Sequence, residues 1–70
     1  MTPFAIGRIK VTRDPGYIPV KFAMKGHSIL LKMVTSEWFP LVELAKDTKQ
    51  AMEILRRDKQ FYNIQQYTKV

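Results

Sequence analysis

The residues of this chain that most clearly indicate a function are its lysines and arginines, because their excess over carboxylates lies in one half of the sequence. Residues 1–36 hold six of them against one carboxylate, whereas residues 37–70 hold six against five. The net charge of +6 therefore lies almost entirely in the first half. A clustered positive field attracts anions such as nucleic acid, anionic lipid or an acidic protein surface.

Catalytic chemistry finds little support in the sequence. His27 is the only histidine, and no second residue has a spacing that would complete a metal site with it. Several carboxylates fit structural roles, since Glu53 lies four residues from both Lys49 and Arg57, the spacing of helix ion pairs. There is no glycine-rich phosphate loop, nucleophile elbow or pair of catalytic acids. We therefore expect no enzyme, no cofactor and no metal.

The cations need a scaffold, and residues 18–33 predict a β-hairpin. Even positions are apolar in "YIPVKFAM" and odd positions in "SILLKMV", which is the two-residue period of half-buried strands. A two-residue turn at Lys25-Gly26 would pair Phe22 with Ile29, and the apolar pattern places the same residues on one face. The two signals agree, which favours the hairpin.

The stretch "GRIKVTRDPGY" before the hairpin predicts another strand and a turn. Pro15 and Gly16 suit the central positions of a type I or II turn. The apolar phase changes at Gly7, and a glycine at such a change suggests a β-bulge. Pro19 lacks the N–H that a central strand needs, so it should lie near a bulge, or the strand order should differ from a simple meander.

Cations alternate with apolar residues along these strands and should point away from the core. The outward cations are Arg8, Lys10, Lys21 and Lys32, with Lys25 in the turn. A loop at 13–16 would set Arg8 opposite Lys21, where like charges lower stability. No acidic residue falls on these strands. The pattern indicates either protection of strand edges against aggregation or a surface for an anionic partner.

The second half of the chain changes to a helical period. "DTKQAMEILRR" separates apolar from charged side chains, which predicts an amphipathic helix over about residues 48–58. Asp47 and Gln50 have the spacing of a capping box. Because Pro40 fits poorly inside a helix, we expect an edge strand over residues 37–46, with a helix as the alternative. Aromatic and β-branched residues after the helix predict a last strand.

The segment "LRRDKQFYNIQQY" interleaves basic and aromatic residues, a mixture that suits base stacking and phosphate binding. A structural interpretation is stronger. Arg56 and Arg57 would lie in the last helical turn, where positive charge offsets the helix dipole, and the aromatic residues would pack against the helix. By the same reasoning we expect Trp38 and Phe39 in the core.

Together these elements predict one small α+β domain over residues 1–70. Its antiparallel sheet has three to five strands, starts with a β-hairpin meander, packs against one main helix and ends with a C-terminal strand. The expected core consists of Val20, Phe22, Ile29, Leu31, Ile54 and Leu55. The chain lacks cysteine, which fits a reducing compartment, and has neither an 18-residue apolar run nor a signal-peptide pattern. We expect a cytoplasmic protein without a membrane partner.

The leading functional hypothesis is binding of DNA or RNA by the outward sheet face, mostly through phosphates and with weak sequence selectivity. Its site residues would be Arg8, Lys10, Lys21, Lys25 and Lys32. The alternative is a small inhibitor or adaptor that docks on an acidic protein surface with the same cations. A third hypothesis is a structural subunit that forms a homodimer through an exposed edge strand.

Overall fold

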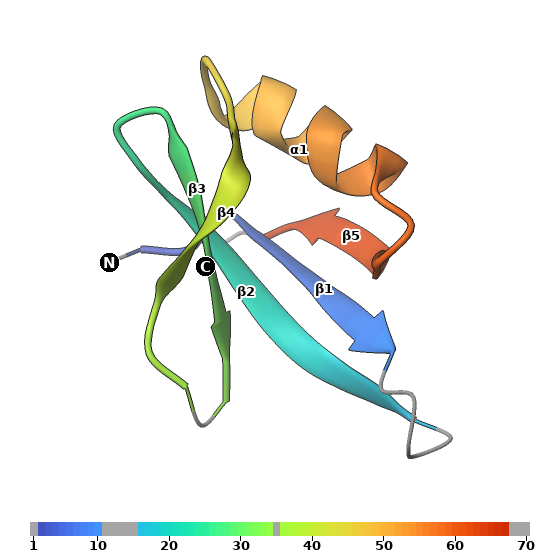
Figure 1. Ribbon diagram of the computed structural model, residues 1–70. Helices are drawn as coiled ribbons and strands as arrows, with labels where there is room; N and C mark the ends of the chain where they lie inside the picture. Colours follow the sequence, from blue (N-terminus) through green and yellow to red (C-terminus); the bar gives the residue numbers. More distant parts are fainter. Residues whose placement is uncertain (1, 11–15, 35, 68–70) are drawn as a thin grey trace.

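The computed structural model describes residues 2–10, 16–34 and 36–67, and within these ranges it contains five strands and one helix (Figure 1). The elements are β1 (Ala5–Lys10), β2 (Tyr17–Lys25), β3 (Ser28–Met33), β4 (Phe39–Leu44), α1 (Thr48–Arg57) and β5 (Phe61–Gln66). The strands form one sheet in the order β4-β3-β2-β1-β5, and each neighbouring pair is antiparallel. The predicted α+β class, the initial meander and the C-terminal strand are confirmed.

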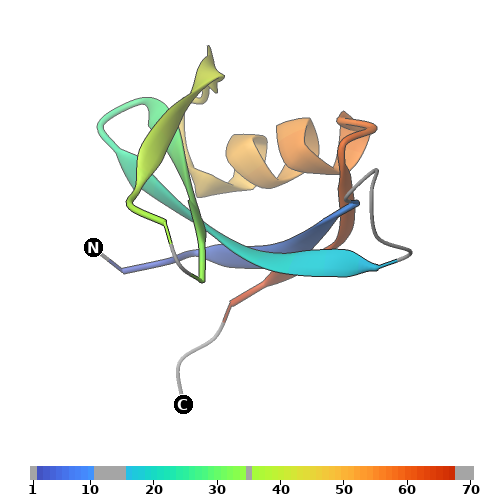
Figure 2. The same ribbon diagram turned by 60° about the horizontal axis from the view of Figure 1, so that its bottom comes forward.

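The core lies between one face of the sheet and α1. Val20 and Phe22 of β2 and Leu31 of β3 meet Leu55 of α1 in a single buried cluster. The Phe22 ring also contacts Phe61 of β5 edge to face, with centroids 5.1 Å apart. Five of the six predicted core residues are buried, and the sixth, Ile54, is partly buried against them. Figure 2 shows α1 on one side of β1 and β2.

The helix forms where the amphipathic period predicts it. The Asp47 side chain accepts a hydrogen bond of 2.8 Å from the Gln50 backbone N–H, which caps the first turn. The Gln50 side chain accepts from the Lys46 backbone N–H at 2.6 Å, one residue before the position of a standard capping box. Ala51 and Leu55 are the buried residues of the helix, one turn apart.

The β2–β3 hairpin has the predicted strands but a different register. Lys25 pairs with Ser28, so the turn consists of Gly26 and His27 rather than Lys25 and Gly26. Gly26 is the only turn residue with a positive φ, 63°, as a type II′ turn requires at its first central position. Phe22 consequently pairs with Leu31 and not with Ile29.

The register of the β1–β2 pairing is also shifted by two residues from the predicted one. Arg8 lies opposite Pro19, and Lys21 lies opposite Ile6. The predicted turn at Pro15 falls largely outside the described residues. Because each slip is two residues long, the cations and the apolar residues of β2 and β3 keep their predicted faces of the sheet. Ile6 does not, because β1 alternates regularly through Gly7 and Ile6 lies on the face opposite the buried Ala5 and Gly7.

Pro19 is accommodated within the central strand because its pairing with β3 has already ended. The Phe22 carbonyl accepts from the Phe4 N–H, so Phe22 directs its backbone groups toward β1. Backbone groups alternate along a strand, which directs Pro19 toward the β3 side. The β2–β3 ladder stops at Val20 and Met33, so the missing N–H of Pro19 breaks no ladder hydrogen bond.

A bulge does occur near Gly7, but the extra residue is in β5. Between Ile6 and Arg8 the β1–β5 register shifts by one residue, and Asn63 takes a positive φ of 54° there. The shift turns Ile64 inward over Gly7, where a Cβ would lie 2.5 Å from the Ile64 Cδ1 atom. Gly7 therefore permits the close approach of β5, and β1 keeps a regular alternation.

The edge strand β4 confirms the preference for strand over helix at this position, and Pro40 is tolerated at the edge. The expectation that Trp38 and Phe39 belong to the core is wrong. Phe39 is 41% exposed, and Trp38 is only partly buried. Val42 and Leu44 of this edge strand are also exposed.

Candidate nucleic-acid interface

The face of the sheet opposite α1, here called the open face, carries the predicted cations. On β1, Ala5 and Gly7 are buried and face the helix, so Arg8 and Lys10 project to the other side. On β2 and β3, Phe22 and Leu31 face the core, so Lys21, Lys25 and Lys32 project with Arg8. Four of these five side chains are exposed, and Lys32 is partly buried.

Two of the cations face each other directly. Lys21 and Lys32 form a cross-strand pair on β2 and β3, a position in which like charges are destabilising. The Lys32 ammonium lies 5.9 Å from the centroid of the Trp38 ring, which is a cation–π contact.

Carboxylates are absent from four of the five strands. The segments of β1, β2, β3 and β5 contain five cations and no Asp or Glu. Opposite charges on the same strands would neutralise the face, as they do on most mixed protein surfaces. The positive potential of the open face is therefore not cancelled by its own strands.

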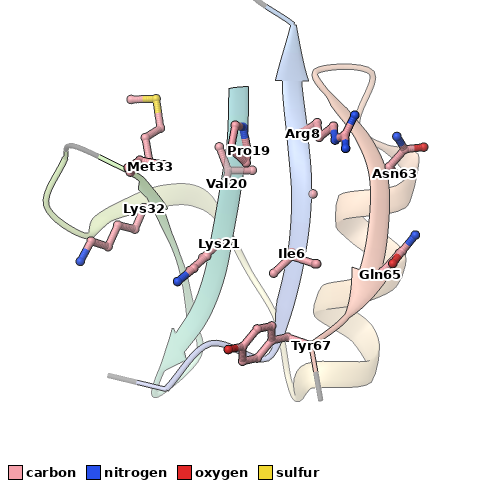
Figure 3. A pocket seen from close by; sticks show the side chains of 12 residues that line it. Ile6, Arg8, Pro19, Val20, Lys21, Lys32, Met33, Asn63, Gln65 and Tyr67 are labelled. Carbon is pink, nitrogen blue, oxygen red and sulfur yellow. The ribbon is translucent and has the colours of Figure 1, made fainter. Parts of the chain in front are cut away.

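The centre of the open face is hollowed. The hollow has a volume of about 540 Å³, and Figure 3 shows its residues on β1, β2, β3 and β5. Its lining consists of Ile6, Gly7, Arg8, Pro19, Val20, Lys21, Lys32, Met33, Val34, Asn63, Gln65 and Tyr67. The hollow thus combines an apolar floor with three cations, two side-chain amides and one phenol.

The structure brings together three of the five predicted site residues. Arg8, Lys21 and Lys32 line the hollow, whereas Lys10 and Lys25 do not. Tyr17, the cross-strand partner of Lys10, is eight residues from Lys25 along β2, so Lys10 and Lys25 are roughly 26 Å apart at about 3.3 Å per residue. The predicted set forms a central cluster with one cation toward each end of the sheet.

Sequence reasoning missed the tyrosines of this face. Tyr17 lies opposite Lys10, and Tyr62 lies opposite Arg8, so each aromatic ring neighbours a cation of β1. The two rings meet edge to face with centroids 5.2 Å apart, across β1. Tyr62 belongs to the tail segment "LRRDKQFYNIQQY". As its structural interpretation predicted, Arg56 and Arg57 lie in the last turn of α1 and Phe61 is buried, whereas Tyr62 is exposed on the open face.

The remaining sequence candidates form no second site. His27 is exposed in the β2–β3 turn, and its Nδ1 atom lies 3.2 Å from the Ala45 carbonyl. Across residues 2–10, 16–34 and 36–67, no three metal-ligating side chains come together. The one helix in these ranges is too short to span a membrane.

Comparison with known proteins gives no match: neither a protein-family model, nor a curated protein, nor a solved structure is similar to this chain at a significant level.

Proposed function

We propose that this protein binds nucleic acid through the open face of its sheet. The observation that supports the proposal is the placement of five cations on one face, on strands that contain no carboxylate. Nucleic acid presents a dense row of phosphates, and lysine and arginine bind it by releasing the counterions condensed on that row. The role is therefore binding rather than catalysis.

Phosphate contacts carry most of the affinity in this proposal. Arg8, Lys21 and Lys32 line the hollow, and Lys10 and Lys25 extend the positive surface toward the ends of the sheet. Lysine acts as a point charge without directional base recognition, and four of the five cations are lysines. We therefore expect weak sequence selectivity.

A salt titration tests the proposal. If three to five phosphates are neutralised, a plot of log affinity against log salt should have a slope between about −2 and −4.5. The slope is shallower for single strands and steeper for duplexes. The measurement is fluorescence anisotropy of labelled DNA and RNA oligonucleotides. An absence of binding at low salt for every oligonucleotide would contradict the proposal and favour an acidic protein as the partner.

A matched pair of variants separates position from net charge. Lys21→Gln with Lys32→Gln, and Arg56→Gln with Arg57→Gln, each lower the net charge from +6 to +4, a change of two. The first pair should weaken binding at least tenfold and flatten the salt slope by about 1.4 to 1.8. The second pair, at the end of α1, should leave binding nearly unchanged. Equal losses from both pairs would show attraction by net charge alone.

A further inference from the structure

The shape of the open face argues against a duplex as its ligand. A protein element that reads a duplex groove must project into that groove, as a helix or a two-stranded ribbon does. Here the centre of the face is recessed instead, between β3 on one side and β5 on the other (Figure 3). A duplex lying across this face would touch the cations but leave the hollow unfilled.

The chemistry of the hollow fits an unpaired nucleobase. Its volume of about 540 Å³ is within the range of about 300 to 1,000 Å³ that small-molecule sites occupy. Ile6 and Pro19 offer an apolar floor for the flat face of a base, and Tyr67 offers an aromatic wall. Asn63 and Gln65 each carry a donor and an acceptor for the edge of a base.

The tyrosines outside the hollow extend the same chemistry. Tyr17 is 49% exposed and Tyr62 is 40% exposed, on either side of β1, and each is opposite a cation of that strand. Surfaces that bind single strands combine cations along the backbone with aromatic rings on which successive bases stack. This combination is built by three strands that are separate in sequence, β1, β2 and β5.

We propose that the ligand of the open face is a single-stranded nucleic acid, with one base seated in the hollow and neighbouring bases against Tyr17 and Tyr62. The proposal rests on the proposed function and narrows it from nucleic acid in general to unpaired strands. In this arrangement Arg8, which lines the hollow and is the cross-strand partner of Tyr62, contacts the phosphates that connect these bases.

The test compares four labelled probes of equal length at one low salt concentration. They are a single-stranded DNA, a single-stranded RNA of the same sequence, the matching duplex DNA, and a single strand in which the central residues are abasic. Either natural single strand should bind at least tenfold more tightly than the duplex and than the abasic strand, because base stacking on aromatic rings is lost from the latter two. Preference for DNA or for RNA would support the proposal equally.

Duplex and abasic probes that bind as tightly as the natural single strands would overturn this proposal while leaving nucleic-acid binding by the open face intact. Failure of all four probes to bind would overturn both. The two results are distinguishable in one series of titrations.

A matched pair of aromatic variants locates the stacking. Tyr62→Ala removes an aromatic ring that is 40% exposed on the open face. Phe39→Ala removes a ring of β4 that is 41% exposed and lies on the other face of the sheet, with its cross-strand partner Leu31. Tyr62→Ala should weaken single-strand binding about five- to tenfold and barely change abasic binding. Phe39→Ala should change neither. Circular dichroism melts confirm that both variants are folded, and equal effects of the two variants would overturn the assignment.

Discussion

Gly7 is the single residue on which the packing of β1 against β5 depends most closely. A Cβ at this position would lie 2.5 Å from Ile64 Cδ1, 3.3 Å from Phe22 Cε2 and 3.3 Å from the Tyr62 carbonyl oxygen. Gly7→Ala should therefore lower the free energy of unfolding by about 1 to 3 kcal/mol, because a buried side chain and a strand backbone must both shift. Urea denaturation monitored by Trp38 fluorescence measures the change.

The control for this prediction is a double-mutant cycle. Ile64→Val removes the Cδ1 atom that a new Cβ would meet, so Gly7→Ala should cost less in the Ile64→Val background than in the parent protein. Equal costs in both backgrounds would show that the Ile64 contact is not the cause.

At the scale of elements, α1 is held at its start by one side chain. Asp47 accepts a hydrogen bond from the Gln50 N–H, and no acidic residue lies in the first turn to add to this cap. Asp47→Ala should lower stability by about 1 kcal/mol, within the usual range of about 0.5 to 2 kcal/mol for a lost N-cap. The measurement is the urea midpoint at constant m-value.

Asp47→Ser is the matched control, because a serine hydroxyl can accept the same hydrogen bond, and it should retain most of the stability. Neither variant should change nucleic-acid binding below the unfolding transition, because α1 packs on the core side of the sheet. A loss of binding in folded Asp47→Ala would contradict the separation of the helix from the open face.

At the scale of the whole molecule, the charge that suits binding opposes folding. Lys21 is exposed and directly opposite Lys32. Lys21→Glu replaces a like-charge pair with an opposite-charge pair, and should raise stability by about 0.2 to 1 kcal/mol at low salt. The gain should shrink at 1 M salt, where the screening length is about 3 Å. The same variant should bind nucleic acid at least tenfold more weakly.

Lys25→Glu provides the matched control for this trade-off. It changes the net charge by the same amount on the same strand, but its partner across the ladder is Ser28 and not a lysine. It should therefore stabilise less than Lys21→Glu in paired urea titrations. A larger gain from Lys25→Glu would mean that general repulsion, rather than the Lys21–Lys32 pair, limits stability.

The sequence by itself determined which way β2 and β3 face. Side chains alternate along a strand as a local property of the chain, so the apolar positions of β2 and β3 already placed Phe22 and Leu31 inward and Lys21 and Lys32 outward. The signals that predicted the helix were equally local, since its apolar period and its N-cap both lie within residues 47–57. The five cations therefore share a face in the structure as the alternation predicted.

Tertiary structure alone decided the register and the shape of the open face. A slip of two residues preserves every inward and outward position, so alternation cannot detect it, and the conformation of Gly26 settled the β2–β3 pairing. The hollow and the Tyr17–Tyr62 contact arise because β5 returns beside β1, a pairing between segments more than fifty residues apart. No local pattern reports such a pairing, because its free energy comes from the packing of distant side chains in one core. For that reason the outward cations were visible in the sequence, whereas the placement of Tyr62 beside Tyr17 and opposite Arg8 became visible only in the fold.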